Sequence, residues 1–131
     1  MIVDSSAVIA IIFDEPDAER YSEALAGAVA PRIPAPNWLE VAIVVGARED
    51  GDLGRSFDAF MVRTGLEIAA FGQQHAEAAR EGWRTFGKGR HPAKLNFGDC
   101  LAYGFAKAEG LPLLFKGNDF PLTDIDPALK D

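Results

Sequence analysis

The sequence predicts an α/β fold, a three-layer α/β/α sandwich with a central parallel sheet. Short apolar segments alternate with longer helical patterns along the chain, and this alternation favours parallel strands joined by helices that cover both sheet faces. The length of 131 residues, with 48% hydrophobic and 25% charged residues, is typical of a globular protein with one core. We therefore expect residues 1–131 to form a single domain with one active site.

The predicted strands are short and rich in branched or bulky apolar residues. They lie at 1–4, in a brief piece near Ile33, at 66–71 and at 111–115. The first strand ends in Asp4, and Asp119 follows the last. Ligands of parallel sheets bind beyond the carboxyl ends of the strands, so we expect both carboxylates at that edge.

Capping residues and proline breaks indicate two helices in the first part of the chain. Ser5 or Ser6 can cap a short helix that contains the apolar run 7–13. Pro16 suits the first turn of a second helix, which runs to about Ala30.

The later helices are predicted from apolar residues that recur on one helical face. One opens at Asn37 and runs, largely buried, to about 50–51, another closes at Gly65, and the last runs from Asn96 to Glu109. The apolar stripes of the two most amphipathic helices are Leu53, Phe57, Phe60 and Met61 in one, and Ala76, Ala79, Trp83 and Phe86 in the other.

Four carboxylates stand in apolar sequence instead of on a polar face: Asp4, Glu40, Asp99 and Asp119. A carboxylate buried among apolar groups is costly unless it is paired, hydrogen-bonded, protonated or bound to a cation. A cluster of carboxylate oxygens suits hard divalent ions such as Mg²⁺ or Mn²⁺, whereas a single cysteine and two separated histidines disfavour zinc.

Each carboxylate also has a structural interpretation. Glu40 and Asp99 stand three residues after Asn37 and Asn96, a spacing typical of a capping box. Asp4 can cap a helix, and Asp119 can be an ordinary turn residue. These roles do not exclude metal binding, because the helix dipole keeps a carboxylate in the first turn ionised.

Four blocks of the sequence carry a family resemblance that covers the whole chain. They are Met-Ile-Val-Asp-Ser-Ser-Ala at 1–7, Pro-Asn-Trp-Leu-Glu-Val-Ala at 36–42, Leu-Asn-Phe-Gly-Asp-Cys-Leu-Ala-Tyr at 95–103 and Leu-Leu-Phe-Lys-Gly-Asn-Asp-Phe at 113–120. The chain resembles the PIN domain, and specifically the VapC-type ribonuclease toxins of toxin–antitoxin pairs. The two later blocks, at their observed separation, are the specific ones.

The resemblance implies a Mg²⁺- or Mn²⁺-dependent ribonuclease that hydrolyses RNA phosphodiester bonds, a cognate antitoxin and a homodimer. It implies that Asp4, Glu40 and Asp99 bind metal, that Asp119 is the fourth acid and that Ser6 is a polar neighbour. Many relatives have an additional acid where this chain has Asn118, which can supply a neutral oxygen. One or two ions would polarise the phosphate and activate a water. The apolar stretches 7–13 and 41–45 also favour a dimer, because they offer more apolar surface than one small sheet covers.

The charge distribution bears on how such a protein would hold RNA. The net charge is −7, but the stretch 80–94 contains five basic residues and one acidic residue. Such a run is commonly a solvated surface, yet here it includes a Gly/Pro loop that leads into the helix of Asp99. We predict that Arg84, Lys88, Arg90 and Lys94 contact RNA phosphates.

Other function classes fit less well. A phosphoacceptor receiver domain needs adjacent acids near Asp4, and a haloacid-dehalogenase-type phosphatase needs a second aspartate at the position of Ser6. A PIN nuclease that processes RNA outside a toxin pair, or a PIN domain that only binds, remains an alternative. We expect His75, His91 and Cys100 to be structural. The single cysteine and the lack of an apolar run that could span a membrane predict a cytoplasmic protein.

Overall fold

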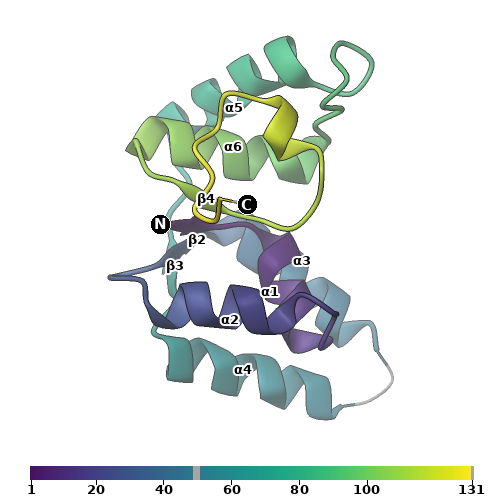
Figure 1. The fold of residues 1–131 in the computed structure, drawn as a ribbon, viewed down its shortest axis with the longest axis vertical. Coiled ribbons are helices and arrows are strands. Elements are labelled where there is room, and N and C mark those ends of the chain that lie inside the picture. The colour runs from purple at the N-terminus through teal and green to yellow at the C-terminus, as the bar shows by residue number, and fades with distance from the viewer. Residues whose placement is uncertain (49–50, 131) are drawn as a thin grey trace.

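The computed structural model describes residues 1–48 and 51–130, and it confirms the parallel central sheet. The strand order is β3-β2-β1-β4 (Figure 1). The central strand β1 (Ile2–Val3) pairs in parallel with β2 (Arg32–Pro34) and β4 (Leu113–Leu114), and β2 pairs in parallel with β3 (Glu67–Ala69). The brief strand predicted near Ile33 is confirmed as β2, whereas β1, β3 and β4 are shorter than the sequence predicts.

Helices cover both faces of the sheet, as Figure 1 shows. Four helices pack around the core on one face: α1 (Ser5–Ile12), α2 (Ala18–Ala26), α3 (Ala35–Gly46) and α4 (Asp52–Thr64). The other face carries α5 (Gln73–Phe86) and α6 (Phe97–Glu109), together with the C-terminal segment and its short 3-10 helix η1 (Phe120–Leu122). The three layers agree with the predicted sandwich.

Alternation along the short strands divides the interior into two cores. Val3 and Leu114 belong to the cluster under the first four helices, whereas their neighbours Ile2 and Leu113 belong to the cluster under α5 and α6. Successive side chains of a strand point to opposite sheet faces, so two residues of each strand are enough to contact both cores. This arrangement fixes the place where β1 ends and Asp4 begins.

Several predicted helix boundaries are wrong. Asp4, not Ser5 or Ser6, caps α1. The second helix ends at Ala26 because the chain turns after Gly27, and Pro16 lies before its start at Ala18. The third helix starts at Ala35, two residues before Asn37, because Pro34 fits the turn that leads out of β2. It is not largely buried as predicted, since only Asn37, Val41 and Val45 are buried. That helix ends at Gly46, and part of the predicted end near 50–51 lies outside the described residues.

The paired helices α5 and α6 approach closely because two glycines leave room. A Cβ on Gly104 would lie 2.3 Å from the backbone nitrogen of Ala79, and one on Gly82 would lie 2.4 Å from the ring of Tyr103. The loop between these helices is closed at its base by a bridge between Gly87 and Leu95. No helix among the described residues is both long and apolar enough to cross a membrane.

Candidate active site

Asp4 is a buried carboxylate at the carboxyl end of the central strand, and it is only 3% exposed. Its Oδ2 accepts hydrogen bonds from the backbone N–H of Ser6 at 3.0 Å and from the Ser6 hydroxyl at 2.5 Å. Its Oδ1 is buried and has no hydrogen-bond partner within the described structure. Burial raises the pKa of Asp4 from its usual 3.8 to about 7.

Ser6, the predicted polar neighbour, is also held by the chain just beyond the neighbouring strand. The backbone N–H of Lys116, just beyond β4, donates to the Ser6 hydroxyl oxygen at 2.9 Å. The Lys116 ammonium pairs with Glu15, which is not one of the four predicted carboxylates, at 2.7 Å. Asp4 is therefore oriented by a short chain of hydrogen bonds that links two adjacent strand ends.

Glu40 is an exposed residue of α3, and it contacts two segments that are distant from it in sequence. The hydroxyl of Ser5, a buried residue, donates to Glu40 Oε1. A Cβ on Gly98 would lie 3.2 Å from Glu40 Oε2, so the first turn of α6 passes directly beside this carboxylate. Ser5 therefore lies next to a predicted metal ligand, although the sequence predicts only a capping role for it.

Asn37 connects α3 to α6, and the prediction that it caps a helix is wrong. It is fully buried in the first turn of α3, and its Nδ2 donates to the carbonyl oxygen of Gly98 at 3.2 Å. The capping-box interpretation of Glu40 fails with it, because α3 starts at Ala35. The partner of Asn37 lies 61 residues away in sequence, so no local pattern could reveal this contact.

Asp99 does take part in the predicted capping box at the start of α6. The Asp99 N–H donates to Asn96 Oδ1 at 2.9 Å, and the Asn96 N–H donates to Asp99 Oδ2 at 3.1 Å. Burial, followed by the negative charges of Asp119 and Glu40, raises the pKa of Asp99. The second carboxylate oxygen of Asp99 has no part in this capping box.

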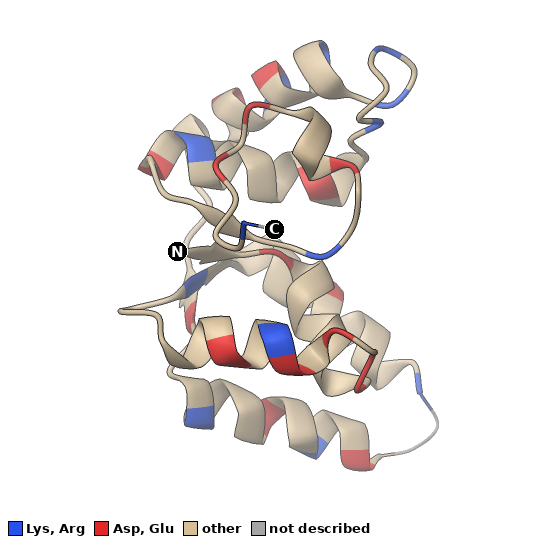
Figure 2. Ribbon diagram, viewed as in Figure 1, with Lys and Arg blue, Asp and Glu red and all other residues tan. Residues whose placement is uncertain are grey.

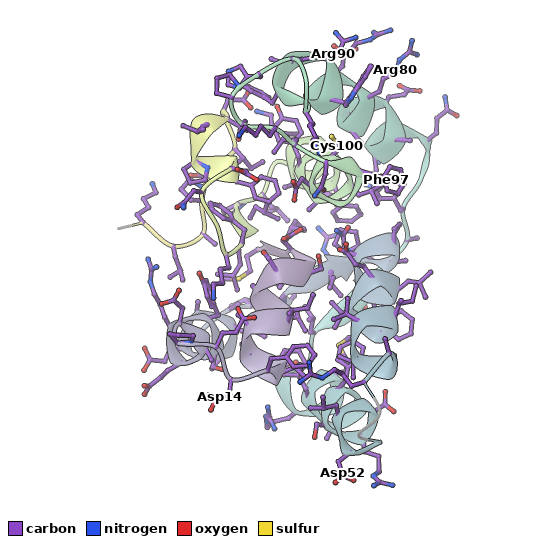
Figure 3. The ribbon with its side chains drawn as sticks, turned by 90° about the vertical axis from the view of Figure 1, so that its right-hand side faces the viewer. Asp14, Asp52, Arg80, Arg90, Phe97 and Cys100 are labelled. Atoms are coloured by element: carbon purple, nitrogen blue, oxygen red, sulfur yellow. The ribbon has the colours of Figure 1, made fainter. Side chains whose placement is uncertain are left out.

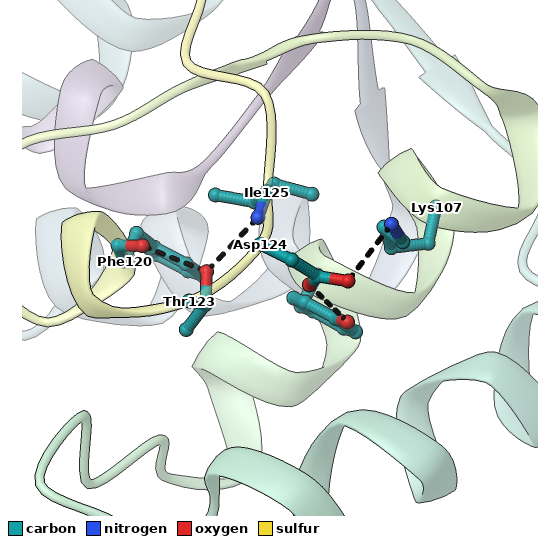
Figure 4. A network of polar contacts seen from close by, with 6 residues as sticks. Lys107, Phe120, Thr123, Asp124 and Ile125 are labelled. Atoms are coloured by element: carbon teal, nitrogen blue, oxygen red, sulfur yellow. Dashed lines mark hydrogen bonds and ion pairs between the residues drawn. The ribbon is translucent and has the colours of Figure 1, made fainter.

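Asp119 is exposed and directly precedes η1, and Asn118 beside it is also exposed. The segment after it is fastened to α6 by a polar network around Asp124 (Figure 4). The Tyr103 hydroxyl donates to Asp124 Oδ1 at 2.6 Å, and the Lys107 ammonium donates to Oδ2 at 3.2 Å. Burial and the Asp124 hydrogen bond raise the pKa of Tyr103. This network keeps the chain that carries Asp119 beside the helix that carries Asp99.

The four predicted carboxylates lie close enough for their charges to affect one another's pKa values. Asp4 is affected by the charges of Asp99 and Glu40, and Asp99 by those of Asp119 and Glu40. The buried, unpartnered Oδ1 of Asp4 and the surrounding oxygen donors fit a hard divalent cation. In the described part of the chain, no three acidic, histidine or cysteine side chains already converge on a single point. Glu40 Oε1 already accepts a hydrogen bond from the Ser5 hydroxyl.

The loop between α5 and α6 contains Lys88, Arg90 and Lys94, and we call it the basic loop. It leads into the start of α6, where Asp99 lies (Figure 2). Lys88 lines the same hollow as Asn96 and Phe97, two residues before Asp99. Lys88, Arg90 and Lys94 are exposed in the loop, whereas Arg84 lies on α5 and is paired with Glu81 at 2.9 Å. Of the four predicted RNA contacts, Arg84 is therefore the one whose charge is already matched.

The two histidines and the cysteine have structural environments, as predicted. His75 is buried, stacks on Phe105 at 4.2 Å and accepts a hydrogen bond from the Gly72 N–H at 2.9 Å. His91 accepts a hydrogen bond from the Ala93 N–H within its loop. Burial raises the pKa of the Cys100 thiol to about 11, which disfavours a thiolate nucleophile.

Comparison with known proteins identifies close relatives over nearly the whole chain. The family model of the PIN domain matches residues 1–126. The chain is 46% identical to Ribonuclease VapC30 of Mycobacterium tuberculosis over 125 residues, which cover 95% of both sequences. It is 44% identical to a Ribonuclease VapC of Mycolicibacterium smegmatis, covering 95% of this chain and 97% of that one.

Solved structures share the fold at lower sequence identity. VapBC2 from Rickettsia felis, bound to a DNA fragment from its promoter, superimposes with a TM-score of 0.71 at 21% identity, covering 96% of this chain and 95% of that chain. The sarcin–ricin-loop-cleaving toxin VapC20 of Mycobacterium tuberculosis gives a TM-score of 0.71 at 15% identity, covering 96% of this chain and 98% of that chain.

Proposed function

Since the chain belongs to the VapC ribonucleases of the PIN-domain family, we propose that it is a metal-dependent endoribonuclease and the toxin of a toxin–antitoxin pair. The observation that carries this proposal is the buried, unpartnered Oδ1 of Asp4 among the charges of Glu40 and Asp99. Such an oxygen requires a cation or a proton, and the neighbouring oxygen donors supply the rest of a metal site. Residues 1–131 would act as one domain.

Asp4, Glu40 and Asp99 would hold Mg²⁺ or Mn²⁺, and ribonucleases of this family generally depend on a metal ion. When bound, the ion supplies charge that polarises the scissile phosphate and lowers the pKa of an attacking water. Ser6 and the Lys116 N–H orient Asp4, and Ser5 positions Glu40. Asp119, which is exposed and less constrained, would orient the water, with Asn118 as a neutral oxygen donor beside it.

The basic loop would guide the RNA backbone to these acids. A polyanion approaching four carboxylates needs nearby positive charge, and Lys88, Arg90 and Lys94 provide it from exposed positions. Contacts of this kind position a strand through its phosphates without specifying its sequence. Arg84 would contribute less, because Glu81 already neutralises it.

We expect two protein partners, an antitoxin and a second copy of the chain. The Rickettsia felis structure contains a VapB together with its VapC, which supports an antitoxin here. A lysine or arginine of that antitoxin would enter the acidic site.

A dimer is supported by Leu39, Ile43 and Val44, three exposed apolar residues of α3. The stretch 7–13 contributes less than predicted, because Ala7, Val8 and Ala10 are buried and its other side chains are partly buried against the core. An RNA substrate and an unpaired thiol favour the cytoplasm.

The assignment of the carboxylates is tested by single substitutions that remove one negative charge. Asp4→Asn, Glu40→Gln and Asp99→Asn should each lower Mg²⁺-dependent RNA cleavage by about 100-fold or more, and Asp119→Asn by less. Asp58→Asn, an exposed site on α4, is the control and should retain activity. If one of the first three variants keeps full metal-dependent cleavage, that residue is not a ligand.

Metal removal separates a site defect from a folding defect. In EDTA the three ligand variants should unfold at the same urea concentration as the parent or at a higher one, because each relieves repulsion among the acids. A variant that is inactive and also unfolds at a much lower urea concentration would not support a metal role.

The antitoxin proposal is tested by co-expression. The product of a neighbouring short reading frame should suppress toxicity if that product is the antitoxin.

A further inference from the structure

An apolar groove lies between α5 and the start of α6, and we call it the α5–α6 groove. It has a volume of about 630 Å³, and Ala79, Leu95 and Cys100 provide its buried floor. Two aromatic side chains line it: Trp83 from α5, which is 44% exposed, and Phe97 from α6, which is 81% exposed. The groove therefore presents aromatic rings to solvent beside an apolar hollow.

The packing of the fold does not account for these two aromatic residues. Among the described residues, neither Trp83 nor Phe97 belongs to a core cluster or to the side chains packed against one. Gly87 leaves space for the indole, since a Cβ there would lie 2.5 Å from a Trp83 ring carbon. Exposed aromatic rings beside an apolar hollow are typical of a binding surface.

The rim of the groove is positively charged although the chain as a whole carries −7. Arg80 and Lys88 line it, and the guanidinium of Arg90 stands 4.2 Å from the centroid of the Trp83 ring. Within the described ranges, Arg84 alone among the cations of 80–94 is held in an ion pair. Figure 3 shows Arg80, Arg90 and Phe97 at the same end of the molecule, opposite Asp52.

The groove reaches the carboxylate site through Asn96. Asn96 lines the groove beside Phe97, and its N–H donates to Asp99 Oδ2 at 3.1 Å. Phe97 and Asp99 themselves face different sides of α6, because they are two residues apart on a helix. A strand that runs from Asp99 past Asn96 would place a neighbouring nucleotide at Phe97.

We propose that the α5–α6 groove binds an unpaired nucleobase of the RNA substrate next to the scissile phosphate. The base stacks on Phe97 and Trp83, and Arg80 and Lys88 contact the flanking phosphates. A nucleotide offers the flat apolar face of its base and the negative charge of its phosphate, so it matches both the aromatic walls and the cationic rim. An apolar protein segment would match only the walls. The inference rests on the proposed ribonuclease function.

The experiment measures how tightly the protein binds a short single-stranded oligoribonucleotide in EDTA, where it is not cleaved. Phe97→Ala should weaken binding by about tenfold, the loss expected for one base stacked on one ring. Phe97→Tyr should restore it, because the ring is kept. Val62→Ala, at an 86% exposed apolar position on α4, is the matched control and should bind as the parent does.

An oligomer with abasic nucleotides isolates the base from the backbone. The parent and Phe97→Ala should bind this oligomer equally, whereas Lys88→Gln should weaken binding of both oligomers and flatten the salt dependence. Equal affinity of the parent and Phe97→Ala for the intact strand would overturn the proposal, as would an equal loss on the abasic strand.

Three further outcomes distinguish this proposal from a subunit interface and from the ribonuclease function itself. If Phe97→Ala converts a dimer to a monomer in sedimentation, the groove is a subunit interface and the proposal is wrong. If the parent cleaves RNA but Phe97→Ala binds the oligoribonucleotide as tightly as the parent, the groove proposal is wrong and the ribonuclease function stands. If the parent neither binds nor cleaves RNA with Mg²⁺ or Mn²⁺, both fail.

Discussion

Asp4 carries the strongest electrostatic conflict in the site, because it is buried and one of its oxygens is unpaired. Its pKa is raised to about 7, so the folded protein holds a proton that the unfolded chain releases near pH 4. The contribution of Asp4 to stability is therefore greatest below pH 4 and is lost as the pH rises through 7.

We predict that the metal-free protein loses stability between pH 5 and pH 8 on account of Asp4. The free energy of unfolding in EDTA, measured with urea, should fall by about 1 to 3 kcal/mol over this range. Asp4→Asn should flatten that dependence, and Asp58→Asn should not. A parent protein whose stability is constant from pH 5 to pH 8 would contradict the burial of an unpaired Asp4 carboxyl group.

At the residue scale, Asn37 connects the two helices that carry Glu40 and Asp99. Asn37→Ala removes the donor to the Gly98 carbonyl, and the expected cost is about 1 to 3 kcal/mol in the free energy of unfolding. Because Gly98 lies beside Glu40, the variant should also bind Mn²⁺ more weakly in calorimetric titration. Gln74→Ala, at an exposed position on α5, is the control. Lower stability with unchanged Mn²⁺ affinity would limit Asn37 to a structural role.

At the scale of elements, the sequence predicts what is local and misses what depends on the tertiary fold. The cap at the start of α6 was predictable because Asn96 and Asp99 are three residues apart and bond to each other. The Ser5–Glu40 and Asn37–Gly98 contacts were not, since their partners are brought together only by the parallel sheet. The place of Asp4 after the first strand was predictable for a related reason, because the apolar residues Ile2 and Val3 directly precede it in sequence.

The same distinction applies to glycines, which look alike in the sequence. Gly104→Ala should lower the free energy of unfolding by about 1 to 3 kcal/mol, because its Cβ would overlap the backbone of Ala79 on α5. Gly54→Ala on α4 meets no atom within 4 Å and should stabilise the protein by about 0.5 to 1 kcal/mol. Urea unfolding of both variants tests the helix contact. A Gly104→Ala variant as stable as the parent would mean that α5 and α6 are not in such close contact.

At the scale of the whole molecule, charge is distributed in a way that separates two tasks. Asp4, Glu40, Asp99 and Asp119 form one acidic group. The loop between α5 and α6 carries Lys88, Arg90 and Lys94, whereas Arg84 on α5 is matched by Glu81. An acidic protein can thus attract RNA locally while its average charge repels it. The composition alone, with a net charge of −7, would have argued against a nucleic-acid substrate.

The apolar face of α3 is the remaining feature at this scale, and it predicts how two copies associate. Leu39 and Ile43 are 52% and 61% exposed and lie one turn apart, so they form a continuous stripe. Ile43→Asp would place a charge in the centre of that stripe, where burial against a second copy is costly. We expect the parent to sediment as a dimer at micromolar concentration and Ile43→Asp to sediment as a 14.1 kDa monomer. Val62→Asp, which changes an equally apolar and more exposed residue on α4, should remain dimeric. A dimer that persists in Ile43→Asp would move the interface away from α3, since a buried aspartate there could not be accommodated without a partner for its charge.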